Sequence, residues 1–565
     1  MSFINHQSPM NPNYLNNSGL FGRPHRNSKY CWQWVFLCLA SFVLAACSPG
    51  ETRVEEGNRL GEFHAANGSE PQTLDPQVHT GVPENNISMG LFEGLVSADP
   101  KELTPAPGMA ERWEISEDGL TYRFYIRENA KWSDGTPITA ADYQWSWQRA
   151  LHPKMGNEYA YMMFPIKNAE PYGTGKLDDF SQVGIRVIDE RTLEVELENP
   201  TPYFLQLLDH HSYYSVPKHV VLKYGEMTDR YSDWTRPGNM ASNGPFRLAE
   251  WKIYHYVKLE KNPHYWDADN VALNAIYFYP VENFSTEERM FRVGQLHKTF
   301  EIPLDKFPDY KKEHPELLRN NPYLGTYYYQ FNVTRKPFDD VRVRRALALA
   351  IDREALVHQV MYGVVDAAYT LTPPGAAGYE PPVLIDFDPD EAKRLLAEAG
   401  FPEGKGFPHV ELLYNTNESH RKIAVAVQQM WKKYLNVDIT LTNQEWKVYI
   451  DSRNRLQYDM ARAGWIGDVV DPMNFLDLGL STNGNNRSGY KRPEYDDYIL
   501  HTIPGSKTQA ERFENFYQAE TMIMTDLPFV PVYTYKTKYL LSPSVKGFSN
   551  NYLDKYYWKY VSVGN

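Results

Sequence analysis

Apolar and polar residues alternate over residues 113–127, on both sides of the dipeptide Asp118-Gly119. A period of two residues with a turn dipeptide in its middle predicts a β-hairpin. The sequence Thr139-Ala140-Ala141-Asp142 follows soon after, and its spacing is that of a capping box. We therefore expect a helix to begin there and to carry Tyr143, Trp147 and Ala150.

Two further helices are predicted from the residues that would start and stop them. Asp340 precedes a helical repeat that runs through Leu347 to Leu356, and Asp388-Pro389 opens another that Gly400 ends. Aspartate is a favoured N-cap, proline suits the first helical turn, and glycine ends helices.

In the C-terminal half, short apolar runs alternate with segments of helical period. Strands are expected at 410–414, 437–441 and 458–466, with a helix at 423–435 and another after Glu445. Because this order is βαβαβ, we expect a largely parallel sheet covered by helices.

The last strand of that unit carries a charge among small and apolar residues. Arg462 would be costly to bury without a partner, so we expect it to face a polar cavity. Asp468 follows the strand at its carboxyl end, where ligands dock in open α/β sheets. A cation and an anion flanking Trp465 suit a zwitterion such as a peptide. An internal Arg462–Asp468 pair beside a core tryptophan is the alternative.

Composition indicates a large acidic protein. With 565 residues, 42% of them hydrophobic and 14% aromatic, the chain can form two or three lobes. It has 71 acidic against 58 basic residues, and residues 1–46 contain basic residues but no acidic one. The remaining chain is therefore still more acidic, which argues against a nucleic-acid partner.

Residues 1–46 are interpreted as an export signal. An uncharged apolar run at 32–46 follows three basic residues and is shorter than the roughly 20 residues of a spanning helix. It ends in Leu44-Ala45-Ala46-Cys47, which resembles a lipobox. We therefore expect Cys47 to be acylated as the new N-terminus; a plain signal peptide and an uncleaved anchor are the alternatives. Cleavage would remove Cys31 and Cys38 and exclude disulfides.

Residues 47–61 comprise this N-terminus and a polar, charged stretch that is expected to be a tether off the membrane. We expect the fold to begin after it.

Several motifs together resemble a known family. They are the stretch 113–149, Ser242-Asn243-Gly244-Pro245-Phe246, Leu259-Glu260-Lys261-Asn262-Pro263-His264-Tyr265-Trp266, and Pro337-Phe338-Asp339-Asp340-Val341-Arg342-Val343-Arg344. The chain resembles the peptide-binding solute receptors of ABC transporters, solute-binding protein family 5, from Asn67 onward and in order. Within this family it is most similar to the oligopeptide-binding members.

This resemblance implies a periplasmic-binding-protein-like α/β fold, with two lobes that close by a hinge around a cleft and an extra inserted domain. Lobe I would comprise residues 62–92, 218–324 and 536–565, the inserted domain residues 93–217, and lobe III residues 325–535. The resemblance also implies a monomer that uses no cofactor and whose partners are short peptides and the permease subunits of an ABC transporter.

The family pattern can be carried over to individual positions. Asp468 matches the carboxylate that receives the α-ammonium of the peptide, and Arg462 and Arg453 match cleft arginines that orient the ligand or meet its carboxylate. The other matching positions are His420 and Asn415 in the cleft, Val82, Gly464 and Tyr535 as partners of the peptide backbone, which would add a strand to a sheet edge, and Tyr159, His210, Trp446 and Trp465 as pocket lining.

The chain departs from the family pattern at several positions. A disulfide of the family would fall at Gly325 and Ile466 and is absent here. Thr80 replaces a glutamate of the side-chain pockets, Met361 replaces a lysine, and Phe300-Glu301 replaces a Tyr-Asn pair. The preferred peptide length and side chains therefore do not follow from the resemblance.

Enzyme motifs are missing from the expected mature chain. It contains no HExxH, GxSxG, Walker A, GxGxxG or CxxC sequence. Carboxylate pairs such as Asp178-Asp179 and Asp496-Asp497 keep a secreted glycosidase as the enzyme alternative, although their polar surroundings favour solvated faces. For His210-His211 we expect a surface or cleft position rather than a metal site.

The sequence thus predicts a binding protein and not an enzyme. We expect a lipoprotein on the periplasmic side of the membrane that captures short peptides largely independently of their sequence and delivers them to an ABC permease. A murein peptide or another ligand in the same cleft is the alternative within the family.

Overall fold

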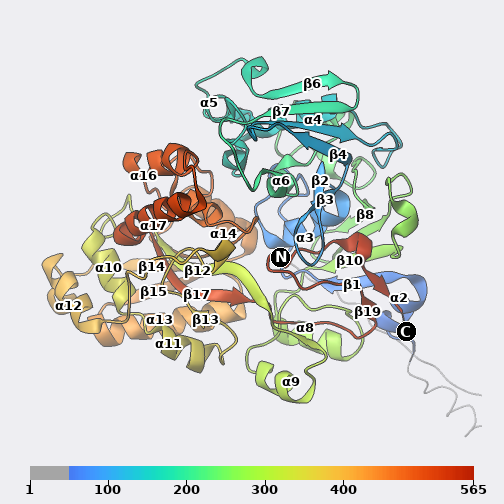
Figure 1. Cartoon of the computed structure of the whole chain (residues 1–565). Helices are drawn as coiled ribbons and strands as arrows, with labels where there is room; N and C mark the ends of the chain where they lie inside the picture. Colours follow the sequence, from blue (N-terminus) through green and yellow to red (C-terminus); the bar gives the residue numbers. More distant parts are fainter. Residues whose placement is uncertain (1–49, 565) are drawn as a thin grey trace, which may run out of the picture. The chain divides into compact units, whose positions relative to one another are not determined.

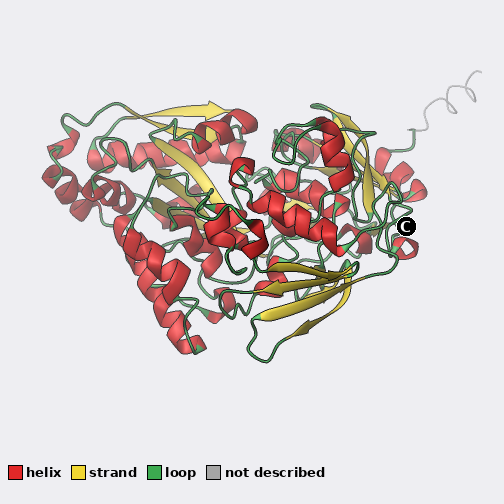
Figure 2. Ribbon diagram, turned by 90° about the horizontal axis from the view of Figure 1, so that it is seen from above, coloured by secondary structure: helices red, strands yellow, loops and turns green. Residues whose placement is uncertain are grey.

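Three sheets organise residues 50–564, the part of the chain that the computed structural model describes (Figure 1). Seen from above, the strands lie in three separate groups with helices between and around them (Figure 2). The predicted export signal and Cys47 lie outside the described residues. The residue boundaries of lobe I, the inserted domain and lobe III stay predictions, and these names are used below for those ranges.

Lobe I contains the sheet β1-β10-β9-β8, in which β1 pairs parallel with β10 and the other pairs are antiparallel. Its elements are α2 (Arg53–Leu60), β1 (Glu62–Ala66), α3 (Val82–Leu91), α7 (Lys218–Tyr224), β8 (Phe246–Lys252), β9 (Tyr256–Lys261), β10 (Ala275–Tyr279), α8 (Phe284–Arg292) and α9 (Phe307–Glu313). Trp558 packs its ring against Phe63 of β1 and Phe278 of β10, at centroid distances of 5.5 and 5.4 Å. Three segments distant in sequence therefore share this core.

The inserted domain contains the antiparallel sheet β4-β5-β7-β6. Its elements are β2 (Val96–Ala98), β3 (Pro105–Pro107), β4 (Ala110–Ile115), β5 (Thr121–Ile126), α4 (Ala140–Leu151), α5 (Ala169–Gly173), β6 (Ile185–Asp189), β7 (Thr192–Glu196) and α6 (Phe204–Leu207). The predicted hairpin is confirmed as β4–β5, with Gly119 at φ +70° in its turn. The predicted helix is α4, where the Thr139 backbone N–H donates to Asp142 Oδ2 at 2.8 Å.

Lobe III contains the six-stranded sheet β13-β17-β12-β16-β14-β15. Its strands are β12 (Pro322–Phe331), β13 (Asp366–Ala367), β14 (Val410–Asn415), β15 (Ile439–Gln444), β16 (Met460–Ile466) and β17 (Phe529–Lys536). Its helices are α10 (Val341–Leu349), α11 (Arg353–Ala355), α12 (Pro389–Glu398), α13 (Glu418–Leu435), α14 (Trp446–Asn454), α15 (Met473–Leu476), α16 (Pro493–Asp497) and α17 (Gln509–Asp526). The predicted βαβαβ unit is confirmed as β14-α13-β15-α14-β16.

The expectation of a largely parallel sheet in lobe III is wrong. Only β14–β15 and β14–β16 pair parallel, whereas β12 pairs antiparallel with both β16 and β17, and β17 antiparallel with β13. Strands from outside the βαβαβ unit complete the sheet, and their long-range pairing leaves no periodic signal in the unit itself.

The helix expected from Asp340 through Leu356 is also shorter than predicted. The Asp340 side chain accepts from the Arg342 backbone N–H, as expected of an N-cap, but α10 ends at Leu349. Asp352 then caps α11 by accepting from the Ala355 backbone N–H at 2.9 Å. A second N-cap inside the apolar repeat thus divides the segment into two helices.

The tether expected at 47–61 is wrong for most of its length, because α2 occupies it. Thr52 and Glu55 form a capping box, and Gly61 ends the helix at φ +70°. Gly57 is buried, and a Cβ there would lie 2.9 Å from the His297 ring, so the helix fits closely against lobe I. No helix among residues 50–564 is long and apolar enough to cross a membrane.

The chain passes between lobe I and lobe III in two neighbouring crossings. Strand β11 (Leu318–Arg319) pairs antiparallel with β18 (Tyr539–Leu540), and Pro322 of β12 pairs with Lys536 of β17. The chain ends in a small ribbon of β19 (Val545–Lys546) and β20 (Ser562–Val563). The two crossings therefore lie side by side, as a paired connection between the lobes.

Candidate ligand-binding site

A cavity of about 250 Å³ is lined by residues from all three parts of the fold. The predicted site residues that line it are Val82, Tyr159, Asn415, His420, Trp446, Arg453, Arg462, Gly464, Trp465, Asp468 and Tyr535. His210 is not in the lining, although its ring lies within 3.3 Å of the Asp468 carboxylate. A larger opening of about 1050 Å³ lies between residues 161–207 and 469–512 and is lined by none of these residues. The fold therefore gathers the predicted residues at one place.

One oxygen of the Asp468 side chain is left without a hydrogen bond among the described residues. Its Oδ1 atom lies 3.3 Å from Nε2 of His210, and its backbone N–H donates to Asn474 at 2.7 Å. Its Oδ2 atom is buried and has no hydrogen-bond partner within residues 50–564. Asp468 can therefore accept from a cationic group that enters the cavity.

Arg462 is held by neutral groups and does not pair with Asp468. Its Nη2 atom donates to the Tyr535 hydroxyl at 2.7 Å, and its Nη1 atom to Asn415 Oδ1 at 3.3 Å. The guanidinium lies 4.7 Å from the ring centroid of Tyr327, and its Nε atom has no acceptor among the described residues. The alternative of an internal Arg462–Asp468 pair is therefore wrong, and this cation keeps donor capacity toward the cavity.

Gly464 is required by the close approach of Tyr535. A Cβ at this position would clash with the Tyr535 hydroxyl, which Arg462 uses as its acceptor. The strand β16 thus carries a small residue where the hydrogen bond between Arg462 and Tyr535 passes over it.

His420 lies in the first turn of α13 and is neutral. Its backbone N–H donates to the cap residue Asn417 at 3.1 Å. Burial, together with the nearby charges of Arg462 and Lys538, holds its pKa well below the usual value. Because Nδ1 has no partner among the described residues, His420 offers a neutral polar atom rather than a second cation.

One edge of β16 is open toward its carboxyl end. On one side, β16 pairs with β12 along its whole length, from Met460 to Ile466. On the other side, its pairing with β14 covers only Met460 and Ala461. The part of β16 that passes the cavity can therefore accept an extended segment as an added strand.

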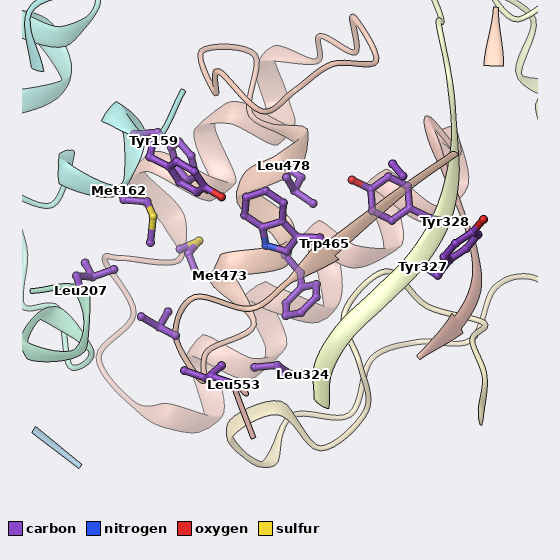
Figure 3. Packing of buried hydrophobic residues seen from close by; sticks show 14 of the residues in the cluster. Tyr159, Met162, Leu207, Leu324, Tyr327, Tyr328, Trp465, Met473, Leu478 and Leu553 are labelled. Atoms are coloured by element: carbon purple, nitrogen blue, oxygen red, sulfur yellow. The ribbon is translucent and has the colours of Figure 1, made fainter. Parts of the chain in front are cut away.

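Aromatic rings connect the inserted domain with lobe III across the cavity. Trp465 faces Tyr159 at a centroid distance of 5.9 Å, and Figure 3 shows Met162 beside Tyr159 and Leu478 beside Trp465. The Tyr159 ring also contacts His210 at 4.7 Å. At another part of the wall, Trp446 begins α14, and its ring together with the Glu84 side chain leaves no room for a side chain at Gly81.

Sequence reasoning missed several lining residues. Arg487 and Asn485 come from the irregular segment before α16, Glu301 from lobe I, and Lys538 from the second crossing. Glu301 and Lys538 form a partly buried ion pair of 2.9 Å. These positions carry no periodic pattern, and only the family departure at Phe300-Glu301 pointed toward one of them.

The departures from the family pattern lie in different surroundings. Thr80 lines the cavity, whereas Met361 is fully buried and lies outside the lining. Gly325 and Ile466 are direct partners in the β12–β16 register, and a Cβ at Gly325 would lie 2.6 Å from the Ile466 side chain. The isoleucine thus fills the space beside the glycine.

The carboxylate pairs considered for an enzyme lie away from the cavity. Neither Asp178-Asp179 nor Asp496-Asp497 lines the cavity. His210 and His211 are 3% and 4% exposed, so neither lies at the surface. His211 lines the cavity, in agreement with the cleft position that was the other part of the prediction. Within residues 50–564 no group of three or more His, Cys, Asp or Glu side chains could hold a metal ion.

Comparison with known proteins places this architecture among solute receptors. The family model "Bacterial extracellular solute-binding proteins, family 5 Middle" matches residues 104–487. The chain is 41% identical over 537 residues to the periplasmic oligopeptide-binding protein of Salmonella typhimurium. This alignment covers 93% of this chain and 96% of that protein.

Solved structures agree with the fold. The Escherichia coli murein tripeptide binding protein is 36% identical, with a TM-score of 0.85 over 89% of this chain and 98% of that one. The oligopeptide-binding protein of Haemophilus influenzae in complex with RPPGFSPFR is 34% identical, with a TM-score of 0.84 over 89% and 99%. These matches confirm the predicted class of two α/β lobes with an extra domain.

The arrangement of the lobes differs from that of an open receptor. The murein tripeptide binding protein in its unliganded open form gives a TM-score of only 0.60, at 36% identity over 91% of this chain and 99% of that one. The structure of the same protein described above has the same identity to this chain but a TM-score of 0.85. The present conformation is therefore unlike the open form.

Proposed function

The chain belongs to the bacterial extracellular solute-binding proteins of family 5, and from this premise we propose that it captures short peptides and delivers them to the permease of an ABC transporter. Members of this family are binding proteins. The relatives described above are named for oligopeptides and for a murein tripeptide. We accordingly propose a peptide receptor that is not an enzyme, that acts as a monomer and that needs no cofactor.

The observation that carries the proposal is a pair of opposite charges that line one cavity without pairing to each other. Within residues 50–564, Asp468 keeps a buried oxygen without a hydrogen-bond partner, and Arg462 keeps a guanidinium nitrogen without an acceptor. A zwitterion supplies both missing partners at once. The α-ammonium of a peptide would bind Asp468, and its carboxylate would approach Arg462 with the neutral His420 beside it.

The open edge of β16 supports the same ligand class. A peptide between Asp468 and Arg462 would run along residues whose sheet pairing exists only on the β12 side. Backbone hydrogen bonds of this kind are available to every peptide, whatever its side chains. The receptor would therefore accept many sequences, with side-chain preferences set by the cavity wall.

The test uses Asp468→Asn with a free peptide and the same peptide acetylated at its N-terminus. Losing one partner of a buried charge pair costs about 2–5 kcal/mol, which corresponds to roughly 30-fold or more in affinity. We expect such a loss by calorimetry for Asp468→Asn and a similar one for the acetylated peptide in the parent protein. The two losses should not add, because each change breaks the same pair.

Asp497→Asn is the matched control, because it removes the same charge from an exposed position of α16. It should leave peptide affinity unchanged. Equal binding of free and acetylated peptides by the parent protein would remove the chemical basis of the proposal.

We also propose that the protein works on the periplasmic side of the membrane, with residues 1–46 as export signal and Cys47 as the acylated N-terminus. Each buried methylene of a lipid chain contributes about 0.8 kcal/mol of membrane affinity. Cys47→Ser should therefore abolish labelling by a fatty-acid probe and move the protein from the detergent to the aqueous phase. Unchanged partitioning would indicate a retained apolar anchor instead.

A murein peptide is the second candidate ligand, because the TM-scores to the murein tripeptide and oligopeptide receptors are practically equal. Native mass spectrometry of freshly purified protein separates the two. A spread of co-purified peptide masses supports the general receptor, and a single muropeptide mass supports the second candidate.

A further inference from the structure

The larger opening between the inserted domain and lobe III has mostly apolar walls. Its volume of about 1050 Å³ is close to the upper end of the range of roughly 300–1,000 Å³ that small-molecule sites occupy. Both parts of the fold supply its apolar and aromatic lining, which includes Met162, Phe164, Tyr203, Met473, Leu480 and Ile503. Figure 3 shows Met162 and Met473 on the same side of Trp465. The opening is therefore large and apolar enough to hold a ligand of its own.

One carboxylate in this lining lacks a counter-charge. Asp477 lies directly after α15, and its side chain makes no hydrogen bond or ion pair within residues 50–564. Arg512 also lines the opening, but both oxygens of Asp471 accept from it, at 2.8 Å each. Burial and the charge of Asp471 raise the pKa of Asp477 well above its usual value, although Arg512 opposes this rise. A cation that enters the opening would supply the missing counter-charge.

A buried hydroxyl of the inserted domain lies near this carboxylate. Tyr161 is 5% exposed, and its hydroxyl has no hydrogen-bond partner within the described part of the chain. Burial raises the pKa of Tyr161, and the nearby charge of Asp477 raises it further. The neighbouring Asn483 amide is already used, because Nδ2 donates to the Asp477 carbonyl at 2.6 Å and Oδ1 accepts from the Asn485 backbone N–H at 2.7 Å. A buried polar group without a partner is unusual and indicates a missing ligand.

The other charged groups of the lining differ from Asp477. Glu198, His501 and Lys507 are exposed to solvent. Glu170 pairs with Lys176 at 3.0 Å. Asp477 is therefore the carboxylate of this lining at which an entering cation would find both an apolar surrounding and an unused partner.

Asn474 connects this opening to the peptide cavity. It lines the opening, and its Oδ1 atom accepts from the Asp468 backbone N–H at 2.7 Å and from Trp465 Nε1 at 3.3 Å. Asp468 and Trp465 line the peptide cavity. Because the walls of both cavities come from the inserted domain and lobe III, a ligand in either one favours the same closed arrangement.

We propose that the opening is a second ligand site, which binds a small primary amine with an aromatic or branched apolar body and favours closure. The ammonium group would lie between Asp477 and Tyr161, since its three donors can serve the carboxylate and the hydroxyl together. The apolar body would pack against Met162 and Met473. The site goes beyond the proposed peptide binding, and only its coupling to the peptide cavity rests on that function.

The test is calorimetry of the peptide-free protein with tryptamine and with tryptophol, the neutral alcohol of the same shape. Tryptamine should bind roughly tenfold more tightly or better, because a charge-assisted hydrogen bond is stronger than a neutral one. In Asp477→Asn this preference should fall to about threefold or less, since the counter-charge is gone. Tyr161→Phe should weaken tryptamine binding by a smaller factor. Equal affinities of the two compounds in the parent protein, or no binding of either, would overturn the proposal.

Asp390→Asn is the matched control, because it removes the same charge from α12, where the side chain is 90% exposed. It should leave the preference for tryptamine unchanged. The melting temperature of Asp477→Asn should equal or exceed that of the parent, since the variant keeps the shape of the side chain and removes an uncompensated buried charge. A lower melting temperature with an unchanged preference would show that Asp477 is merely structural and would overturn the proposal.

A saturating alanine tetrapeptide distinguishes this site from the peptide cavity. The peptide should tighten tryptamine binding, and tryptamine should tighten peptide binding by the same factor. Competition would place tryptamine at Asp468, and unchanged affinities would show that the opening does not respond to closure; either result overturns the proposal. Failure of every peptide to bind would reject the proposed function instead, and the comparison of tryptamine with tryptophol would still decide on this opening.

Discussion

The inserted domain meets lobe I and lobe III through two interfaces of opposite character. Toward lobe I, Arg149 pairs with Asp75 at 2.6 Å, and both side chains are fully buried. Arg149 also donates to Gln77 Oε1 at 2.7 Å, so this charge is satisfied within the protein. Toward lobe III, Asp468 and Arg487 face a cavity and leave charge or hydrogen-bonding capacity unused.

The difference indicates which interface opens. Separating the partners of a buried ion pair is strongly destabilising, because each charge is then left without its counter-charge. The inserted domain should therefore keep this contact and move together with lobe I. Groups with unused capacity lose little when they return to water and gain when a ligand fills the cavity. The interface with lobe III is thus suited to open and close.

The largest effect is expected from Arg149→Met, which would leave the Asp75 carboxylate buried and unpaired. Loss of one partner of a buried pair costs about 3–5 kcal/mol. Urea unfolding should show this decrease in the free energy of unfolding, while the folded fraction binds peptide as before. Arg186→Met, at an exposed pair with Glu196, should cost less than about 1 kcal/mol. Comparable losses in both variants would contradict the assignment of Arg149.

Glu520 is a buried carboxylate in lobe III that has no cationic partner among the residues described by the structure, so it tests the comparison from within lobe III. It is fully buried and accepts from Leu371 N and Thr372 N, at 2.9 and 3.0 Å. Burial raises its pKa to about 7, although these hydrogen bonds oppose the rise. A raised carboxyl pKa gives a stabilising contribution that is complete below the unfolded value near 4.5 and is lost as the pH rises through 7.

Glu520→Gln should therefore be more stable than the parent at pH 8, by up to about 3 kcal/mol, and similar to it at pH 4.5. Glutamine keeps an oxygen acceptor for both backbone N–H groups. Chemical denaturation at the two pH values measures the difference. A variant that is less stable at both would mean that the hydrogen-bond geometry, rather than the charge, determines the contribution.

His79 is a buried histidine of lobe I, and we expect it to lower stability at acidic pH, by less than Glu520 lowers it at alkaline pH. Its ring contacts His211 at 4.0 Å, and burial together with nearby His210 lowers its pKa to about 3. Its neutral form stabilises the fold above the unfolded pKa near 6.5, and this contribution is lost as the pH falls below that value. At pH 5 the loss amounts to about 2 kcal/mol.

His79→Gln should flatten the decrease in stability between pH 7 and pH 5. His409 is exposed, and His409→Gln serves as the control that leaves the decrease unchanged. An equal slope in all three proteins would show that His79 does not hold the proposed neutral state.

The last prediction is that a reductant has no effect on stability. Strand β16 is joined to β12 at Gly325 and Ile466 by register and packing, without a cross-link, and residues 48–565 contain no cysteine. Dithiothreitol should therefore leave the melting temperature unchanged. A decrease of several degrees would reveal an unexpected disulfide.

Local chemistry made much of the fold predictable from the sequence. The caps at Thr139, Asp340 and Asp388 start helices where they were expected, because each cap involves only residues two or three positions apart. The same locality explains two errors. The capping box at Thr52 lies in a polar stretch whose composition predicts a tether, and a second cap at Asp352 interrupts a helix that the apolar repeat alone would continue.

The family pattern made part of the candidate site predictable, whereas the lining residues outside this pattern could not be predicted. The unusual charge in a strand correctly indicated that Arg462 faces a cavity. The place of Arg487 in the cavity lining could not be predicted in this way, because Arg487 lies in an irregular polar segment. Only the fold brings it to the same cavity as Arg453 and Thr80, which are distant in sequence. The antiparallel pairing of β12 with β16 and β17 could not be predicted for the same reason, since the paired residues are far apart in the sequence.

The position of Trp558 sets an order of assembly. Its ring completes a core formed by Phe63 and Phe278, so lobe I stays without a central side chain until the polypeptide has been made through residue 558. Lobe III, whose residues 325–535 are synthesised earlier, has no such dependence. A shortened product would therefore carry a finished lobe III and an incomplete lobe I, which would be exposed to proteolysis. The fold thus distinguishes full-length chains from truncated ones through a single late tryptophan.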